Sequence, residues 1–541
     1  MDDTLERVVR YHERTKHHYD RYARSPGYMD WANQPDPFRI FGGIERTPLP
    51  LLSSDPAAGH MQLFTRGDIP KQGIDLGSVA GFLELSMGLS AWKAVGRNRW
   101  ALRMNPSSGN LHPTETYLLL PAMDGLKPGV FHYQPLLHAL EHRAEVADEW
   151  WEDAIRHMGT DGFFVGLTSI FWRESWKYGE RAFRYCNLDV GHAMAALSFS
   201  AALFGWGVTW LKGLSDRQME SIFGLNRTPW HPEEAEHPDL LCFLHPAGER
   251  TIPVDLPDKA RDELAHLTHG GTPNRLSTQP LKWDAIADVS RCTRKPETKT
   301  PHPDFGSIEP FLAAPAPVSA AEIIRSRRSA TAYDPNGRME KEAFFSLLDK
   351  TLKRPQHPPF DLSPDVPRVH LLLFVHRVDQ IAPGLLWLFR NKHDRNEIRR
   401  MTRNEFLWEP VTDQLPLYYL DKADYRYRAI ELSCHQEIAG DSAFSLGMVA
   451  NFKKTLRKGP HRYRHLYWEC GMIGQVLYLE AEAHGYRGTG IGCFFDDPVH
   501  ETLGLVDNTY QSLYHFTVGT PVEDARLTTH PPYLHLKGER R

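Results

Sequence analysis

The sequence predicts an α+β protein in which two copies of one domain lie in tandem. Its 541 residues exceed the size at which a single hydrophobic core stops growing, so two domains are expected. Residues 184–225 also recur 280 positions later, and solenoid repeats reach only about 50 residues, so a whole domain is duplicated. The recurring positions are Arg184, Asp189, Gly191, Gly205, Thr209, Asp216, Gly224 and Leu225, which return as Arg464, Glu469, Gly471, Gly485, Thr489, Asp496, Gly504 and Leu505.

Composition describes an ordinary globular protein. Apolar residues make up 41% of the chain and charged residues 24%, and the net charge of −5 gives no support for nucleic-acid binding. The six cysteines are scattered without a CxxC pair, which favours a reducing compartment and argues against a zinc site or a disulfide framework. No His, Asp and Glu spacing indicates another metal site. The first residues also lack the basic and apolar regions of a signal peptide.

One stretch, Ala193 to Leu211, is apolar enough to suggest a membrane span. Its repeat partner, residues 472–491, carries Glu480, Glu482 and Arg487. Two copies of one element should share an environment, so we expect a buried core helix and a cytoplasmic protein without a membrane partner.

Copy one is assigned to residues 1–270 and copy two to residues 319–541. Between them, residues 271–318 are rich in Pro, Thr and charge, including Pro301-His302-Pro303 and the Ala-Pro run at 313–317. This composition predicts an extended linker.

The elements of each copy follow the same order. Copy one is predicted to have a strand at 114–120, a turn at Pro128-Gly129 and a long apolar helix ending at Gly205. A short strand and a helix closing at 223–225 follow. Copy two opens with a helix capped by Ser319, with Glu322 three residues on. It continues with a strand at 369–375, a turn at 383–384, a helix ending at Gly485 and a last helix closing at 503–505.

Two short segments predict binding chemistry. Residues 325–329 cluster three arginines with serines, and forked guanidinium donors match phosphate oxygens. A solvated basic face remains the alternative. Residues 105–113, Asn-Pro-Ser-Ser-Gly-Asn-Leu-His-Pro, combine small residues with polar side chains. Such a loop can approach a flat ring closely and supply hydrogen bonds, although it could also be a polar turn.

These segments resemble the FMN-dependent nitroreductase superfamily, and more closely its azoline dehydrogenase (SagB/ThcOx) branch. The resemblance covers most of both copies except the linker and residues 390–424. Its quoted motifs are Arg327-Arg328-Ser329, residues 106–113, Lys177-Tyr178, Arg184-Tyr185, residues 189–192, residues 488–492 with Asp496, Val518-Gly519-Thr520 and residues 524–526. The resemblance implies two nitroreductase-like domains that form a pseudo-dimer within one chain, with FMN at their interface.

Carried over by position, the family's FMN site is divided between the copies. Copy two keeps the arginine-serine clamp for the phosphate, the loop under the flavin ring and a C-terminal arginine. These are expected at Arg327, Arg328, Ser329, Gly490, Gly492, Cys493 and Arg526. Copy one keeps the second loop, expected at Pro106, Ser107, Ser108, Gly109 and Asn110. The opposite interface would set Arg14, Thr15, Lys16, Lys212 and Gly213 against a degraded loop at 362–367. We therefore expect one FMN per chain.

Lys177 and Tyr178 are the expected catalytic pair, because the azoline dehydrogenases use a Lys-Tyr pair in proton removal. The equivalent positions of copy two are Arg457 and Lys458, so the pair belongs to copy one alone. A surface lysine packed along Trp176 is the alternative interpretation. Asp189 and His192 are expected to bond to each other or to cap a neighbour in the core.

The resemblance predicts an FMN-dependent oxidoreductase that dehydrogenates a peptide-like or heterocyclic natural-product intermediate. Two alternatives stay open. One is a reductase that passes electrons from NAD(P)H to nitroaromatics or quinones, and the other is a non-catalytic scaffold in a peptide-modifying complex. The chain could act as a monomeric pseudo-dimer or as a homodimer. The Gly-rich run at 488–493 lacks the third glycine of a dinucleotide fingerprint.

Overall fold

The two copies form two sheets with the same strand plan. The computed structural model describes residues 3–64, 69–248, 251–298, 318–354, 357–363 and 365–536. Each sheet has seven strands, and its strand pairings are antiparallel. The copy-one order is β2 (Arg46–Pro48), β7 (Ala139–Glu145), β6 (Gly129–Gln134), β5 (Thr114–Leu120), β8 (Phe163–Ser169), β10 (His237–Pro246), β9 (Trp206–Trp210). The copy-two order is β14 (Glu409–Pro410), β15 (Leu417–Asp421), β13 (Gly384–Leu388), β12 (Val369–Val375), β16 (Phe444–Asn451), β18 (Tyr510–Gly519), β17 (Arg487–Ile491).

The two predicted strands, β5 and β12, have the predicted bounds and lie at the centre of their sheets. Every residue of both strands is buried, including the polar Thr114, Glu115 and Thr116 at the start of β5. β15 lies within residues 390–424, which the sequence resemblance excluded. It takes the position of β7, so this segment includes a regular strand of the fold.

Helices cover the sheets. In copy one they are α1 (Asp3–Arg14), α2 (Leu76–Ser86), α3 (Asp148–Met158), α4 (Phe171–Tyr178), α5 (Ala182–Leu203), α6 (Asp216–Ile222) and α7 (Asp258–Ala265). In copy two they are α9 (Ala320–Ser326), α10 (Lys341–Lys350), α11 (Arg395–Met401), α12 (Arg426–Leu432), α13 (Ile438–Asp441), α14 (Phe452–Leu456), α15 (Arg462–Ala483) and α16 (Asp496–Leu503). As predicted, Ser319 caps α9 by accepting a hydrogen bond from the backbone of Glu322.

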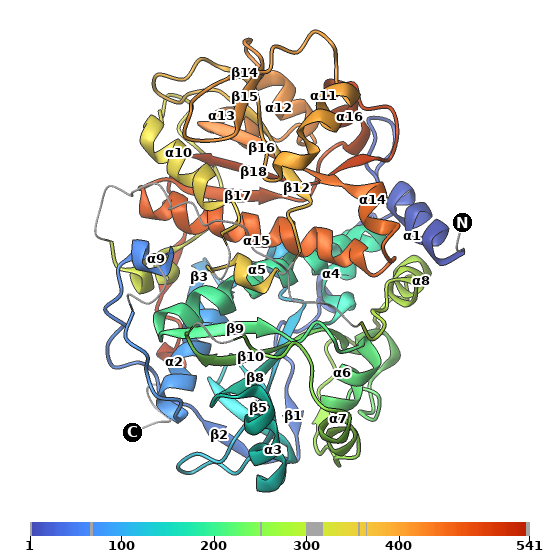
Figure 1. Cartoon of the computed structure of the whole chain (residues 1–541), viewed down its shortest axis with the longest axis vertical. Coiled ribbons are helices and arrows are strands. Elements are labelled where there is room, and N and C mark those ends of the chain that lie inside the picture. Colours follow the sequence, from blue (N-terminus) through green and yellow to red (C-terminus); the bar gives the residue numbers. More distant parts are fainter. Residues whose placement is uncertain are drawn as a thin grey trace.

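The long helices α5 and α15 lie between the two sheets (Figure 1) and pack against each other. Gly205 and Gly485 follow their ends with φ of 68° and 76°, as the predicted glycine caps require. Almost every residue of α5 is buried, which confirms the expected core helix. Within the described ranges, no helix is both long and apolar enough to cross a membrane.

The repeated glycines Gly191 and Gly471 mark the point where α5 and α15 cross. A Cβ on Gly191 would lie 2.2 Å from the carbonyl oxygen of Trp468, and a Cβ on Gly471 would lie 2.2 Å from that of Leu188. Each copy therefore needs glycine at the same position, because the two backbones touch there.

Two repeated ion pairs also connect the copies. Arg184 of copy one binds Asp496 of copy two at 2.7 Å, and Arg464 of copy two binds Asp216 of copy one at 2.6 Å. All four side chains are buried. This reciprocal pairing of equivalent positions is the pattern of a twofold homodimer interface. It is present here within one chain.

A segment outside the repeated core of copy two pairs with a strand of copy one. Near the C-terminus, β19 (Thr528–His530) pairs with β3 (Leu89–Val95), which pairs with β4 (Asn98–Arg103) in copy one. The predicted linker is not wholly extended. It contributes β11 (Thr272–Pro273), paired with β1 (Phe41–Gly42), and α8 (Asp284–Cys292), whose buried Ile286, Val289 and Cys292 give it an apolar face. Its Pro-rich part, 299–317, lies outside the described residues.

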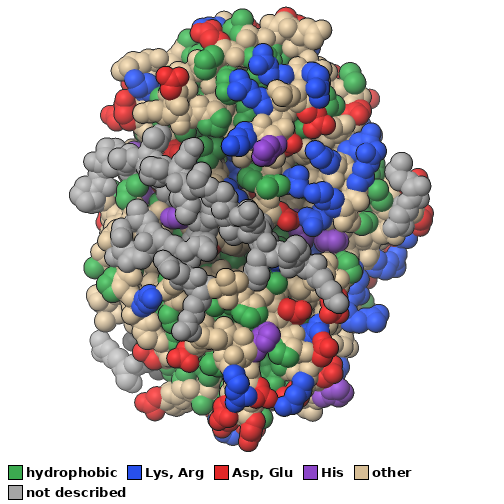
Figure 2. All heavy atoms as spheres, in the orientation of Figure 1, with side chains coloured by type: hydrophobic (Ala, Val, Ile, Leu, Met, Phe, Trp, Pro, Cys, Tyr) green, Lys and Arg blue, Asp and Glu red, His purple; other side chains and the backbone are tan. Residues whose placement is uncertain are grey.

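Charges of both signs cover the face shown in Figure 2. Lys and Arg side chains are most frequent on the upper half of the picture, and Asp and Glu side chains lie among them. Such mixing is typical of an ordinary globular surface.

Candidate active site

One cavity of about 490 Å³ lies between the copies and is lined by both. Copy one contributes residues 106–110 and Tyr178, and copy two contributes residues 327–329 and 490–493. Asn110 and Ser329 therefore face the same space, as the composite-site prediction requires. Of the expected binding residues, all except Arg526 line this cavity.

The loop at 106–110 is held by hydrogen bonds within copy one. The backbone N–H and the hydroxyl of Ser108 both donate to Asp189 Oδ1 at 3.0 Å, and Asn110 Nδ2 donates to Ala101 O at 2.9 Å. Gly109 has a φ of 60°, and a Cβ there would lie 2.6 Å from Tyr178 Oη. The polar side chains thus shape the loop, and glycine lets Tyr178 approach it.

Two buried carboxyl groups lie beneath this loop. Glu174 on α4 accepts a hydrogen bond from Ser107 Oγ at 3.4 Å, and Asp189 on α5 holds Ser108. Burial raises the pKa of Asp189 to about 7, although the bonds from the serines oppose that rise. Burial and the neighbouring Asp189 raise the pKa of Glu174 well above its usual range. Both carboxyl groups can therefore carry a proton near neutral pH.

The expected phosphate clamp lies at the cationic end of the cavity. Arg327 is buried, and among the contacts of the described residues its Nε has no hydrogen-bond partner. Burial lowers the pKa of Arg327, which is the cost of placing a guanidinium there without an anion. Arg328 and Arg487 also line this end. A phosphate group would supply the missing acceptor.

Arg526 does not line the cavity. Its side chain is 82% exposed and pairs with Asp524 at 2.8 Å. The structure instead places Arg487, paired with Glu523, in the cavity wall. Its repeat-equivalent position is Gly207, so a comparison of the two copies could have indicated Arg487.

The loop segment 490–493, which begins with the last two residues of β17, lines the cavity with two glycines. A Cβ on Gly490 would lie 1.8 Å from Tyr514 Oη, and one on Gly492 would lie 2.1 Å from the ring of Tyr185. Tyr478 on α15 connects this loop to the clamp. Its hydroxyl accepts from Gly490 N at 3.0 Å and shares a 2.9 Å hydrogen bond with Ser329 Oγ. Sequence reasoning missed Tyr478, although its counterpart in copy one is Ser198.

The Lys177-Tyr178 pair lies at the C-terminal end of α4, against Gly109. The ideal Cβ position on Gly109 is 3.2 Å from Lys177 Nζ and 2.6 Å from Tyr178 Oη. The Tyr178 ring packs 4.5 Å from that of Tyr185, and burial raises the pKa of its phenol well above the usual range. Tyr178 therefore keeps its proton at neutral pH and can act as a hydrogen-bond donor.

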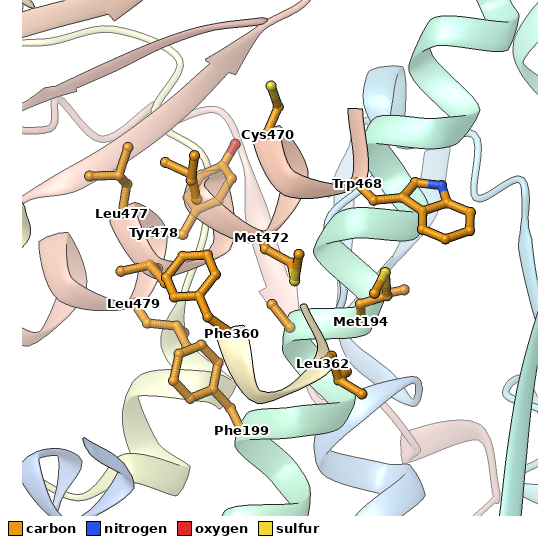
Figure 3. Close-up of a cluster of buried hydrophobic side chains, with 14 of the residues drawn as sticks. Met194, Phe199, Phe360, Leu362, Trp468, Cys470, Met472, Leu477, Tyr478 and Leu479 are labelled. Carbon is orange, nitrogen blue, oxygen red and sulfur yellow. The ribbon is translucent and has the colours of Figure 1, made fainter. Parts of the chain in front are cut away.

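In the part of the chain that the structure describes, the opposite interface is largely filled. Its remaining cavity measures about 30 Å³ and is lined by Trp210, at the position equivalent to Gly490. The lining includes Met194, Leu362, Trp468 and Met472, which belong to the apolar cluster shown in Figure 3. Burial lowers the pKa of Lys212, which occupies the position of Gly492, and the nearby Asp365 partly opposes this. In this interface Trp210 therefore stands at a cavity position where the first site has a glycine.

The expected lining of this second interface needs correction. Arg14, Thr15 and Lys16 do not line the filled interface. Glu180, just before α5, binds Arg14 at 2.5 Å, and Asp497 on α16 binds Lys16 at 2.8 Å, so both side chains have partners elsewhere. For Asp189 and His192 the second of the two expected alternatives holds, because each binds a neighbour and not the other. Asp189 accepts hydrogen bonds from Ser108, and His192 contacts Gln475 and Tyr514 at 3.2 Å each.

Comparison with known proteins gives the family of this chain. The model described as "Nitroreductase family" matches residues 93–234 and 324–520. A "putative nitroreductase" of Methanocaldococcus jannaschii is 26% identical over 133 residues, which span 23% of this chain and 65% of that relative's length.

Solved structures show the same fold. A "putative nitroreductase" from Anabaena variabilis is 22% identical, with a TM-score of 0.67, over 95% of this chain and 99% of that one. The Escherichia coli microcin synthetase complex matches 40% of this chain and 77% of its own at 18% identity. Its TM-score of 0.28 is too low to support any inference. Since the family model covers more than half of the sequence, in two segments with one strand plan, the chain belongs to the nitroreductase family.

Proposed function

We propose that this protein is an FMN-dependent oxidoreductase with one flavin site per chain. The observation that carries the proposal is the contrast between the two interfaces, since one holds a cavity of about 490 Å³ and the other only about 30 Å³. The larger volume falls in the range of small-molecule and cofactor sites.

The residues of the larger cavity fit FMN. Arg327 has a buried guanidinium nitrogen without a partner, which suits the phosphate. Gly109, Gly490 and Gly492 line the cavity, and tyrosine side chains pack where their Cβ atoms would stand. A wall of glycine backbone and tyrosines suits a flat ring. When bound, FMN would supply the two-electron redox chemistry.

We further propose that the reaction is the dehydrogenation of a peptide-like, azoline-type heterocycle, which the resemblance to the SagB/ThcOx branch implies. Lys177 would take the proton that the substrate loses, and Tyr178, which keeps its own proton, would orient the substrate by donating a hydrogen bond. Glu174 and Asp189 lie beneath the same loop and fix its position.

The test begins with flavin stoichiometry. Purified protein is saturated with FMN, freed of excess cofactor and analysed by its absorption spectrum. We expect one FMN per chain, and a ratio near two would contradict the single-site proposal.

Anaerobic stopped-flow mixing then identifies the electron donor. We expect a thiazoline-containing peptide to bleach the flavin absorbance and to lose two hydrogens, as measured by mass spectrometry. Rapid bleaching by NADPH with no reaction of the peptide would instead favour a nitro- or quinone reductase.

A further inference from the structure

Two cysteines far apart in the sequence meet beside the cavity. Cys434 lies between α12 and α13, and Cys493 follows β17 and lines the cavity. Their sulfur atoms are 2.9 Å apart. A disulfide bond measures about 2.05 Å, so the structure shows two thiols in direct contact. The other four cysteines, at positions 186, 242, 292 and 470, are buried.

The backbone around Cys434 directs its side chain toward Cys493. Cys434 and His435 have φ of 54° and 60°, a conformation that side chains other than glycine rarely adopt. Gln436 holds the turn, because its Nε2 donates to Ser433 O at 2.7 Å and to Cys493 O at 3.1 Å. Strain of this kind persists only where the surroundings enforce it, and it is frequent at functional sites.

His17 of copy one completes the cluster. Its Nδ1 accepts a hydrogen bond from Ala23 N at 2.9 Å, so the neutral ring carries its proton on Nε2. The ring also hydrogen-bonds Cys493, which leaves Nε2 as the donor to this sulfur. Arg181 lies beside them and donates to Gly492 O at 3.2 Å.

These neighbours favour a thiolate at Cys493. The hydrogen bond from Cys434 lowers the pKa of Cys493 to about 5, and His17 and Arg181 add to this effect against burial. Burial instead raises the pKa values of Cys186, Cys242 and Cys470 well above the usual range. Only the thiolate form attacks disulfides, so the chemistry is confined to one pair.

We propose that Cys434 and Cys493 form a thiol–disulfide exchange site that reacts with low-molecular-weight disulfides of the glutathione type. The Cys493 thiolate attacks one sulfur of the disulfide, which forms a mixed disulfide and releases one thiolate. The Cys434 thiol then loses its proton and attacks Cys493, which releases the second thiol and leaves a Cys434–Cys493 bond. Two electrons thus pass from the cysteine pair to the small disulfide, and no flavin is needed.

The test uses the full-length protein without added flavin. It is equilibrated with mixtures of oxidised and reduced glutathione, quenched by alkylation and mapped by peptide mass spectrometry. We expect one Cys434–Cys493 cross-linked peptide, with the other four cysteines alkylated. Absence of this cross-link under fully oxidising mixtures would overturn the proposal.

Variants and pH separate this site from general thiol reactivity. Cys434→Ser should stop at a stable glutathione adduct on Cys493, whereas Cys292→Ser should behave like the wild type. Alkylation of Cys493 should change little between pH 6 and 8. A thiol with an ordinary pKa of about 8.5 would speed up roughly 80-fold over that range, and this result at Cys493 would also count against the proposal.

Discussion

At the scale of single residues, some side chains near the cavity shape its loop at 106–110, and others approach that loop from α4. The side chains of Ser108 and Asn110 donate hydrogen bonds to Asp189 and to the carbonyl oxygen of Ala101. Lys177 and Tyr178 instead approach the loop from α4 at the one position where glycine leaves room. Of this pair, Tyr178 lines the cavity, and Lys177 reaches the loop at Gly109 without forming part of the cavity wall.

Replacing Lys177 with alanine should lower the rate of substrate dehydrogenation by roughly 100- to 10,000-fold, because it removes the proposed base. FMN binding should be unchanged. Steady-state turnover and the flavin absorption spectrum measure the two effects. Arg457→Ala is the matched control, since Arg457 occupies the equivalent position in copy two. Unchanged turnover in Lys177→Ala would remove Lys177 from the mechanism.

Replacing Arg327 with alanine should weaken FMN binding roughly 10- to 100-fold, the cost of losing a charge-assisted hydrogen bond to phosphate. Fluorescence titration of apoprotein with FMN measures this. Arg526→Ala is a direct comparison, because the family resemblance assigns Arg526 to the flavin whereas its side chain lies in solvent. A larger loss in Arg526→Ala than in Arg327→Ala would show that the tail closes over the cofactor on binding.

At the scale of elements, the contact between α5 and α15 positions both halves of the site. Asp189 lies on α5 and Tyr478 on α15, so the relative position of these helices sets the distance between the loop of copy one and the clamp of copy two. The two glycines at the crossing allow this close approach.

Gly471→Ala should therefore destabilise the protein by about 3 kcal/mol, because its Cβ would press on the carbonyl of Leu188 and the helices would have to separate. FMN affinity should fall as well. Chemical denaturation and FMN titration give the two values. Gly73→Ala is the control, since a Cβ there meets nothing within 4 Å. Equal stability of the two variants would contradict the close crossing.

At the scale of the whole molecule, the two copies pack against each other as two subunits of a dimer would, within one polypeptide. The reciprocal pairs Arg184–Asp496 and Arg464–Asp216 keep the twofold pattern, whereas the two equivalent interface sites differ. One holds a cavity of about 490 Å³ lined by glycines, and the other holds about 30 Å³ and is lined by Trp210. The two halves thus share their packing and differ in the space between them.

Asp496→Asn should lower the free energy of unfolding by about 3–5 kcal/mol at pH 7, because Arg181 and Arg184 would be left buried without a carboxylate. Burial alone would raise the pKa of Asp496, but these arginines hold it far below its ordinary value. The stabilisation is therefore present above the unfolded-state pKa of about 3.9 and is lost as pH falls below it.

Thermal unfolding between pH 3 and pH 7 measures this dependence. The difference between wild type and Asp496→Asn should shrink as the pH falls below about 4. Asp524→Asn, which changes an exposed pair, should match the wild type throughout. A constant difference across the pH range would mean that the Asp496 charge does not stabilise the fold.

The sequence alone determined the duplication, the central strands 114–120 and 369–375, and the division of binding motifs between the copies. The strands and binding motifs can be recognised from a few neighbouring residues, such as apolar runs, glycine caps and clustered arginines. The helix α8 in the linker escaped prediction because its flanking prolines and charges dominated the composition. Tertiary structure decided which side chains meet: Arg487 rather than Arg526 at the cavity, Trp210 in the closed interface, and Cys434 against Cys493. Such contacts join residues distant in the chain, and only the packing of α5 against α15 fixes the distances between them.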